Sequence, residues 1–277
     1  MAGDENGADA GDENGVDAGD ESGVNAGDEN GAEGRPETDA GGDGPGPRAS
    51  SDVISAVMED YIKSIYAIER DTGERVSTSA LADYLEVTSP TVSSMVKKLE
   101  ERGLVDREEY KGVTLTEEGE VVALEILRHH RLLEAFLTEQ LDYSWVDVHD
   151  EADRLEHHVS EKLSDRIAEA LGNPPVDPHG DPIPDADLSL PTAGDTVRLV
   201  DADEGDRVVV RRIRHQGDAE LRYLSDAGVR PEVELAVVDV APFGMVTVET
   251  PTDDQSLPEE IARLIEVEPA DAAGDGS

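Results

Sequence analysis

One segment of the chain carries acidic and histidine side chains at the spacing that metal ligands take on a helix. Residues 149–158 read HDEADRLEHH, and in a helix Asp153, Glu156 and His157 would stand at positions i, i+3 and i+4 on one face. His149 lies one turn earlier. Carboxylate and imidazole ligands without thiolates suit Mn²⁺, Fe²⁺, Co²⁺ or Zn²⁺. The pattern therefore indicates a candidate metal site.

A second pair of residues and one earlier carboxylate are candidates for the same chemistry. His130 and Glu134 form an i, i+4 pair in an apolar stretch that is typical of a helix. Asp60 belongs to an earlier predicted helix and joins the set only if the fold brings that helix close. A zinc peptidase would need the order His-Glu-x-x-His, which the chain lacks. Because such residues are also typical of a solvated helix face, spacing alone leaves both interpretations open.

Short hydroxyl side chains followed by bases indicate DNA binding further towards the N-terminus. A helix that starts at Pro90 would present hydroxyl groups in its first turn, and serine and threonine contact phosphates or base edges. The bases further along, Arg102 among them, would meet phosphates. No long side chain stands at the helix start to read a base through two hydrogen bonds, which favours recognition of DNA shape or phosphate position. The candidate DNA-binding residues are Thr88, Ser89, Pro90, Thr91, Ser93, Ser94, Lys97, Lys98, Arg107 and Lys111.

The elements around this helix predict a winged helix-turn-helix. Apolar residues recur at helical spacing on both sides of a turn, and a strand, turn and strand follow. The alternative is a helical hairpin that packs against protein. The predicted elements are a helix capped by Ser51 or Asp52 and ending at residues 71–73, a short helix at 80–85, a turn at 87–90, a helix from Pro90 to Gly103, and a hairpin at 104–115.

The remaining sequence predicts a helical part and a small β part. Helical spacing covers residues 117–141 and about 147–171, and a Pro-rich linker occupies 173–194. Residues 196–268 alternate apolar and polar side chains as strands do, with a short helix at 218–226. The predicted fold class is therefore mainly α, with a small β domain that resembles an SH3-like barrel.

The charge of the chain is strongly negative but unevenly distributed. Its 66 acidic and 23 basic residues give a formal charge of −43, which normally argues against a nucleic-acid partner. Residues 88–112, however, hold five acidic and five basic residues and are neutral as a set. The first 33 residues repeat with a period of eight, and residues 1–50 hold fourteen acidic and two basic residues with almost no large apolar side chains. This composition predicts a disordered acidic leader.

Such acidity is similar to that of proteins from halophilic archaea, in whose cytoplasm salt reduces the reach of charge. The Debye length is about 3 Å at 1 M salt, so overall charge would steer little and close contacts would decide. The chain has no cysteine, which excludes disulfides and thiolate metal sites. It has no run of 18 apolar residues and no basic and apolar leader typical of a secretory signal. We therefore expect a cytoplasmic protein.

Several motifs in the same order resemble the diphtheria toxin repressor family of metal-dependent transcriptional regulators, including its manganese-responsive branch. The resemblance runs from about Val57 to Pro184, with a looser similarity to residue 268. The matching stretches are MEDYIKSIYAIE (58–69), SPTVSSMVKKLEERGLV (89–105), VTLTEEGE (113–120), RHHRLLEAFL (128–137), VHDEADRLEHHVS (148–160) and GDPIP (180–184).

The resemblance implies a homodimer that binds a divalent metal, then binds operator DNA and represses metal uptake. The implied domains are the leader at 1–50, a winged helix-turn-helix DNA-binding domain at 51–116, a helical dimerisation and metal-binding domain with the linker at 117–188, an SH3-like or FeoA-like domain at 189–270, and a tail at 271–277. The implied primary ligands are Asp60, Asp153, Glu156 and His157. The implied ancillary ligands are His130, Glu134 and His149, with Glu220 loosely aligned to a further ligand and Gly217 in place of a neighbouring acid.

Two departures within the family bear on the metal. Iron-type members place a thioether and a thiol where this chain has Asp60 and Asp153, whereas the manganese branch has carboxylates. Hard oxygen ligands favour Mn²⁺ through geometry. Short manganese-branch proteins carry a glutamate where this chain has Lys63, which argues against a closely bridged two-manganese cluster. We therefore expect Mn²⁺, with Fe²⁺ as the alternative.

Three other functions compete with a metal-dependent repressor. A winged-helix regulator without a metal switch would bind DNA equally well with a chelator. A metal-dependent hydrolase would need a nucleophile paired with a base, and the sequence offers no candidate, so we do not expect an enzyme. Residues 196–268 would serve protein interaction if they bind peptides as SH3-like barrels do; in the family that this chain resembles, the module docks on its own chain.

Overall fold

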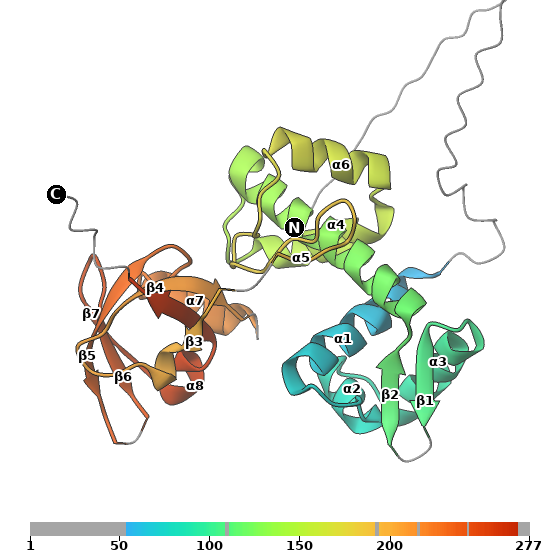
Figure 1. Ribbon diagram of the computed structural model, residues 1–277, viewed down its shortest axis with the longest axis horizontal. Coiled ribbons are helices and arrows are strands. Elements are labelled where there is room, and N and C mark those ends of the chain that lie inside the picture. Colours follow the sequence, from blue (N-terminus) through green and yellow to red (C-terminus); the bar gives the residue numbers. More distant parts are fainter. Residues whose placement is uncertain (1–53, 109–110, 192–193, 215–216, 243, 271–277) are drawn as a thin grey trace, which may run out of the picture. The chain divides into compact units, whose positions relative to one another are not determined.

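The computed structural model describes residues 54–108, 111–191, 194–214, 217–242 and 244–270. The sequence predictions of an acidic leader at 1–50 and a tail at 271–277 lie outside these ranges. Within the described residues, no helix combines the length and the apolar character needed to cross a membrane. Three groups of elements follow one another along the chain, and Figure 1 labels most of their helices and strands.

The first group is a winged helix-turn-helix, as the sequence predicts. It consists of three helices and a two-stranded antiparallel hairpin in which Val105 pairs with Leu115. Val76 adds a single bridge to Val113, so the loop after the first helix joins the edge of the wing. The elements are α1 (Ala56–Thr72), α2 (Thr78–Tyr84), α3 (Ser89–Glu101), β1 (Val105–Glu108) and β2 (Gly112–Leu115).

The start of α1 differs from the prediction, and its end agrees with it. Ser55 is the N-cap residue, and its hydroxyl accepts a hydrogen bond from the backbone amide of Met58. The cap predicted at Ser51 or Asp52 is therefore wrong, because a nearer serine satisfies the free amides of the first turn. Gly73 ends the helix in the left-handed conformation, at φ 68°, which glycine adopts without strain.

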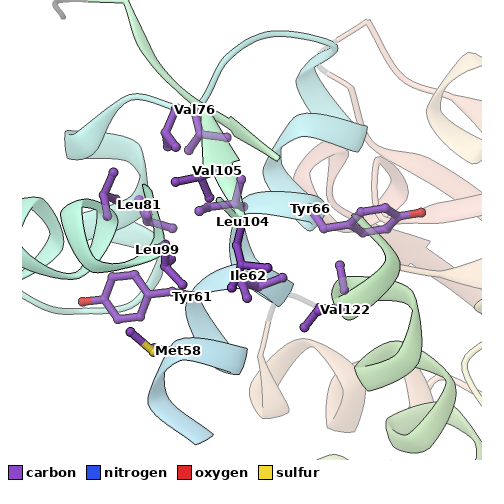
Figure 2. Packing of buried hydrophobic residues seen from close by; sticks show 14 of the residues in the cluster. Met58, Tyr61, Ile62, Tyr66, Val76, Leu81, Leu99, Leu104, Val105 and Val122 are labelled. Carbon is purple, nitrogen blue, oxygen red and sulfur yellow. The ribbon is translucent and has the colours of Figure 1, made fainter. Parts of the chain in front are cut away.

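The core of this group forms where the apolar faces of α1, α3 and the wing meet. Ile62 and Ile65 of α1 and Leu99 of α3 are fully buried. Figure 2 shows Ile62 close to Leu104, with Val122 contributed by the following long helix. Helix α3 is thus held by its apolar side, and its other side stays in solvent.

The second group is helical and contains one break that the sequence did not predict. Its long helix is α4 (Glu117–Leu141), with the bounds expected from its periodicity. The continuous helix expected at about 147–171 is wrong: the chain forms α5 (Val148–Leu155), the 3₁₀ turn η1 (Glu156–His158) and α6 (Glu161–Ala170). Val159 is extended, and the hydroxyl of Ser160 accepts a hydrogen bond from the amide of Leu163 and caps a new helix.

The third group is a small β domain with its own core. Its six strands form one antiparallel sheet in the order β3-β8-β4-β5-β6-β7, with irregular registers at Val210/Arg212 and Val237/Asp239. Such irregularities increase the local twist of a sheet. The elements are β3 (Val197–Arg198), η2 (Leu199–Asp201), β4 (Arg207–Ile213), α7 (Asp218–Asp226), β5 (Glu234–Val240), β6 (Val246–Glu249), β7 (Asp254–Leu257), α8 (Glu259–Ala262) and β8 (Ile265–Pro269).

The predicted Pro-rich linker is partly buried rather than a free connection. Asp177 and His179 are both buried, and the amide of Ile213 in β4 donates a hydrogen bond to the carbonyl oxygen of His179 at 2.8 Å. Arg131 of α4 donates to the carbonyl oxygen of Pro182 at 2.6 Å. We call residues 177–183 the strap, because they contact both α4 and β4.

Candidate metal centre and DNA-facing surface

Three of the four residues expected at a primary metal site lie together. Asp60 comes from α1, and Glu156 and His157 come from η1. The Nε2 atom of His157 lies 3.0 Å from Oδ1 of Asp60 and 3.6 Å from Oε1 of Glu156. One ligand atom from each of the three residues lies within 4.8 Å of the other two. The fold therefore joins the first helix of the winged domain to the turn that follows α5.

Asp153 does not join Asp60 in that group. Its Oδ1 atom lies 3.2 Å from Nδ1 of His130 and 2.7 Å from Nζ of Lys63. The chain breaks after Leu155, so that His157 on η1 faces Asp60 of α1, whereas Asp153 on α5 contacts His130 of α4 and Lys63 of α1. The expectation that three ligands share one face of a continuous helix is therefore wrong.

Glu156 contributes to both neighbouring groups. Its side chain is fully buried, and its Oε2 atom lies 2.6 Å from Nδ1 of His130. With His130 and Asp153 it makes another set whose ligand atoms all lie within 4.8 Å. Glu156 is therefore the carboxylate that connects the Asp60 group with the histidines of α4.

The residues expected at the ancillary site form a close triangle. The Nε2 atom of His130 lies 3.0 Å from Oε1 of Glu134 and 3.0 Å from Nδ1 of His149, and the last two atoms are also 3.0 Å apart. His130 and Glu134 are buried on α4, and His149 stands at the start of α5. Two imidazoles and a carboxylate at these distances fit a divalent transition metal. Glu220 of α7 belongs to none of the candidate groups among the described residues.

The structure adds four residues that the sequence did not single out as part of the centre. The Oε2 atom of Glu59 lies 2.6 Å from Nδ1 of His157. The ammonium group of Lys63 contacts Asp153 and Glu156. Both belong to the helix that carries Asp60: Lys63 lies one turn after Asp60, at a position that the family resemblance had already marked, whereas Glu59 is the neighbour of Asp60 and spacing gives no reason to expect it. The other two are Asp177 and His179 of the strap, which form a buried group with Glu134.

His179 is oriented as metal-binding histidines commonly are. Its Nε2–H donates to the carbonyl oxygen of Trp145 at 2.7 Å, and its Nδ1 atom faces Oε2 of Glu134 at 3.7 Å. Nearby, Asp177 uses its Oδ1 atom to accept hydrogen bonds from the amides of His179 and Asp181. A histidine within a Pro-rich stretch carries no periodic signal, so only the fold brings it to Glu134.

Buried charges of opposite sign shift the ionisation of the centre. Burial raises the pKa of Asp153 and Glu156, but the hydrogen bonds from His130 and the charge of Lys63 outweigh it and hold both pKa values below their usual range. Burial lowers the pKa of His130, yet Glu134 and the other carboxylates raise it well above 6.5. His130 and Lys63 therefore offset part of the negative charge of the carboxylates around them.

Every candidate DNA-binding residue is exposed. The first turn of α3 begins after Thr88, whose hydroxyl is 2.9 Å from that of Thr91 instead of capping a backbone amide. Lys97 pairs with Glu101 at 3.8 Å, and Lys111 pairs with Glu108 at 2.6 Å. These surface pairs contribute little to stability and are easily exchanged for phosphate. The exposed set is Thr88, Ser89, Pro90, Thr91, Ser93, Ser94, Lys97, Lys98, Arg107 and Lys111.

Comparisons with known families match all three parts of the chain. The family described as "Iron dependent repressor, N-terminal DNA binding domain" matches residues 53–113. "Iron dependent repressor, metal binding and dimerisation domain" matches residues 116–185. The "FeoA domain" matches residues 197–269. The matched ranges follow the three groups of elements that the structure describes.

Individual relatives agree over most of their length. The iron-dependent repressor IdeR of Mycobacterium tuberculosis is 36% identical over 222 residues, covering 76% of this chain and 96% of the relative. The diphtheria toxin repressor of Corynebacterium diphtheriae is 31% identical over 219 residues, covering 76% and 96%. A solved structure of a manganese-dependent transcriptional repressor in complex with manganese is 39% identical, with a TM-score of 0.71, and covers 77% of this chain and all of its own.

Proposed function

This chain belongs to the diphtheria toxin repressor family of iron- and manganese-dependent transcriptional repressors, and from that premise we propose how its own residues work. In the proposal, the protein is a homodimer that binds operator DNA when Mn²⁺ is bound, with Fe²⁺ as the alternative, and controls metal-uptake genes. One observation carries the proposal most directly. A candidate metal group contains Asp60 of α1 together with Glu156 and His157 of η1.

The position of Asp60 gives this group a route to the DNA-binding domain. Met58, Tyr61, Ile62 and Ile65 on the same helix are buried in the winged-helix core. Whatever fixes Asp60 relative to His157 therefore also fixes α1, and with it the reading helix α3. This is a coupling between two sites through one element that both sites influence.

The donor set supports Mn²⁺ at the proposed primary site. Asp60, Glu156 and His157 would hold the ion, with Asp153 beside them, and an ion bound there supplies positive charge shared between α1 and η1. Carboxylates and one imidazole, without sulfur, suit Mn²⁺ and Fe²⁺. At the proposed ancillary site the ligands are His130, Glu134 and His149. The carboxylates around His130 raise its pKa above the usual value, and a metal ion bound there would compete with a proton for the same imidazole nitrogen.

The proposed DNA contacts combine short hydroxyls with bases. Thr88, Ser89 and Thr91 at the start of α3 would lie in the major groove, and Lys97 and Lys98 would meet phosphates. The exposure of all these side chains and the neutral charge of residues 88–112 support the assignment. Arg107 and Lys111 of the wing would contact the flanking backbone. Recognition would then depend more on DNA shape than on hydrogen bonds to bases.

The deciding experiment is selection of genomic DNA fragments by the purified protein in molar KCl, with chelator, Mn²⁺ or anaerobic Fe²⁺ in parallel. We expect a palindromic site to be enriched only when metal is present. The ion that gives the stronger enrichment is then identified as the co-repressor. We also expect metal to raise the affinity of the natural chain for DNA. In the double variant Asp60→Ala with His157→Ala, this metal-dependent increase should be at least tenfold smaller.

His158→Gln is the matched control, because His158 is an exposed histidine on the same turn and should leave the response unchanged. Equal enrichment with chelator would leave a winged-helix regulator without a metal switch. An unaltered metal response in the double variant would remove these residues from the proposed site.

A further inference from the structure

Lys63 places a positive charge inside the proposed metal centre. Its Nζ atom lies 2.7 Å from Oδ1 of Asp153, 2.7 Å from Oε1 of Glu156 and 3.0 Å from Oε2 of Glu156. Lys63 belongs to α1, one helical turn after Asp60. The ammonium group therefore stands between two carboxylates that lie 90 and 93 residues away in the sequence.

The surroundings of Lys63 make this contact an internal ion pair. Its side chain is 19% exposed, and that of Glu156 is fully buried. Burying an ammonium group is unfavourable unless opposite charge and hydrogen bonds compensate for the lost water. Asp153 and Glu156 supply both, and Lys63 in turn offsets their mutual repulsion. Without metal, Lys63 therefore holds α1 to α5 and η1.

The same contact occupies atoms that a divalent ion would need. The Oε1 atom of Glu156 contacts Lys63 and faces His157, and the Oε2 atom contacts both Lys63 and His130. An ion held by Asp60, Glu156 and His157 must take one of these oxygens and would stand next to the ammonium group. Positive charges at such short range repel each other strongly in a buried site.

We propose that Lys63 is a built-in counter-ion that a divalent metal must displace from Glu156, so that Lys63 sets the metal concentration at which the protein responds. This inference rests on the proposed function and specifies how its primary site is regulated. Lys63 does not bind the metal; it competes with the metal for carboxylate oxygen and positions α1 while metal is absent.

The test compares Mn²⁺ binding by isothermal titration calorimetry in the full-length protein and four variants. Lys63→Met removes the charge, and Lys63→Gln removes it but keeps a hydrogen-bonding group. Lys63→Arg keeps the charge. Lys162→Met is the matched control, because it removes one lysine charge from an exposed position on α6, away from the carboxylates that Lys63 contacts. Hydrogen exchange of the α1 amides in chelator provides a second readout that needs no metal.

We expect Lys63→Met and Lys63→Gln to bind Mn²⁺ about tenfold more tightly than the natural chain, while α1 exchanges faster in chelator. Lys63→Arg and Lys162→Met should stay within about threefold of the natural chain. Should Lys63→Met fail to fold, Lys63→Gln and Lys63→Arg still separate the charge from the hydrogen bond.

Two results would overturn the inference. Unchanged Mn²⁺ affinity in both neutral variants would show that the metal does not take oxygen from Lys63. Weaker affinity would show that Lys63 orients the carboxylates for the metal instead of competing with it. A natural chain that binds no Mn²⁺ or Fe²⁺ at all would instead contradict the proposed function, so the two failures are distinguishable.

Discussion

At the scale of single residues, His179 shows how a buried histidine contributes to stability. Burial lowers the pKa of its imidazole, but the hydrogen bond and charge of Glu134 and the charge of Asp177 raise that pKa to about 9. A histidine whose pKa is higher in the folded state stabilises the fold fully below about pH 6.5, and this contribution is lost as the pH rises towards the folded value. The charge of His179 therefore stabilises the metal-free strap at neutral pH.

The raised pKa of His179 in the folded state gives a prediction for His179→Gln in the presence of chelator. At pH 6 the free energy of unfolding of the variant should be about 2 kcal/mol lower than that of the natural chain. This difference should shrink as the pH rises to 9.5. Urea unfolding at a series of pH values measures it, with the exposed His158→Gln as control. A difference that stays constant with pH would mean that packing of His179, rather than its charge, stabilises the strap.

The two carboxylates next to Lys63 depend on neighbouring positive charges to stay ionised. Burial raises the pKa values of half-exposed Asp153 and buried Glu156, and the hydrogen bonds from His130 and the charge of Lys63 nevertheless keep both below their usual range. Removing one member of such a set leaves an uncompensated charge, which costs more than the ion pair contributes. The centre is therefore organised before metal binds, and its affinity for metal depends on which cation it already holds.

At the scale of elements, the strap is held close to β4 by a glycine. Gly180 has φ +88°, and a Cβ atom there would lie 1.9 Å from the carbonyl oxygen of Arg211. Asp181 forms an ion pair with Arg212 beside this contact. Any larger residue at position 180 must therefore push the strap away from the strand.

Gly180→Ala tests this close contact, with Gly205→Ala as its matched control. Both glycines have positive φ, but a Cβ atom on Gly205 would meet nothing within 4 Å. We expect Gly180→Ala to lower the free energy of unfolding by about 3 kcal/mol and Gly205→Ala by about 1 kcal/mol, because only the first adds a clash to the backbone strain. Chemical denaturation measures both. Equal losses would show that the strap can move away from β4 at little cost.

At the scale of the whole molecule, two exposed leucines indicate where a second copy would bind. Leu155 of α5 is 37% exposed and Leu163 of α6 is 48% exposed. Both lie in the region that matches a metal-binding and dimerisation domain. Apolar side chains that remain exposed in such a domain are typical of a subunit interface. We propose that these residues lie in the interface of the homodimer.

Leu163→Glu should therefore shift the protein from dimer to monomer in sedimentation equilibrium, with at least a tenfold rise in the dimer dissociation constant. Val238→Glu is the control, because Val238 is similarly exposed, at 45%, but lies on β5 of the β domain. If both variants remain dimeric, the interface does not include Leu163. If both dissociate, the loss reflects added negative charge in a chain that already carries −43.

Sequence alone determined the winged helix-turn-helix, α4 and the β domain, because each depends on a local period of apolar residues. Ile62, Ile65 and Leu99 are buried where helical spacing predicts, and α4 and α7 have the predicted bounds. The motifs around the reading helix and the 149–158 segment also sufficed to identify the family, which the comparisons confirm. The halophilic character inferred from the acidity stays a prediction.

Only the tertiary structure decided how the candidate ligands are grouped. The break at Glu156–His158 depends on Ser160 capping a new helix, a competition between helix continuation and a local hydrogen bond that periodicity does not resolve. That break sends His157 to Asp60 and leaves Asp153 with His130. His179 reaches the centre from the strap, and spacing along a chain carries no information about such a contact. The sequence therefore supplied the ligand types, whereas packing of α1, α4 and the strap decided which of them meet.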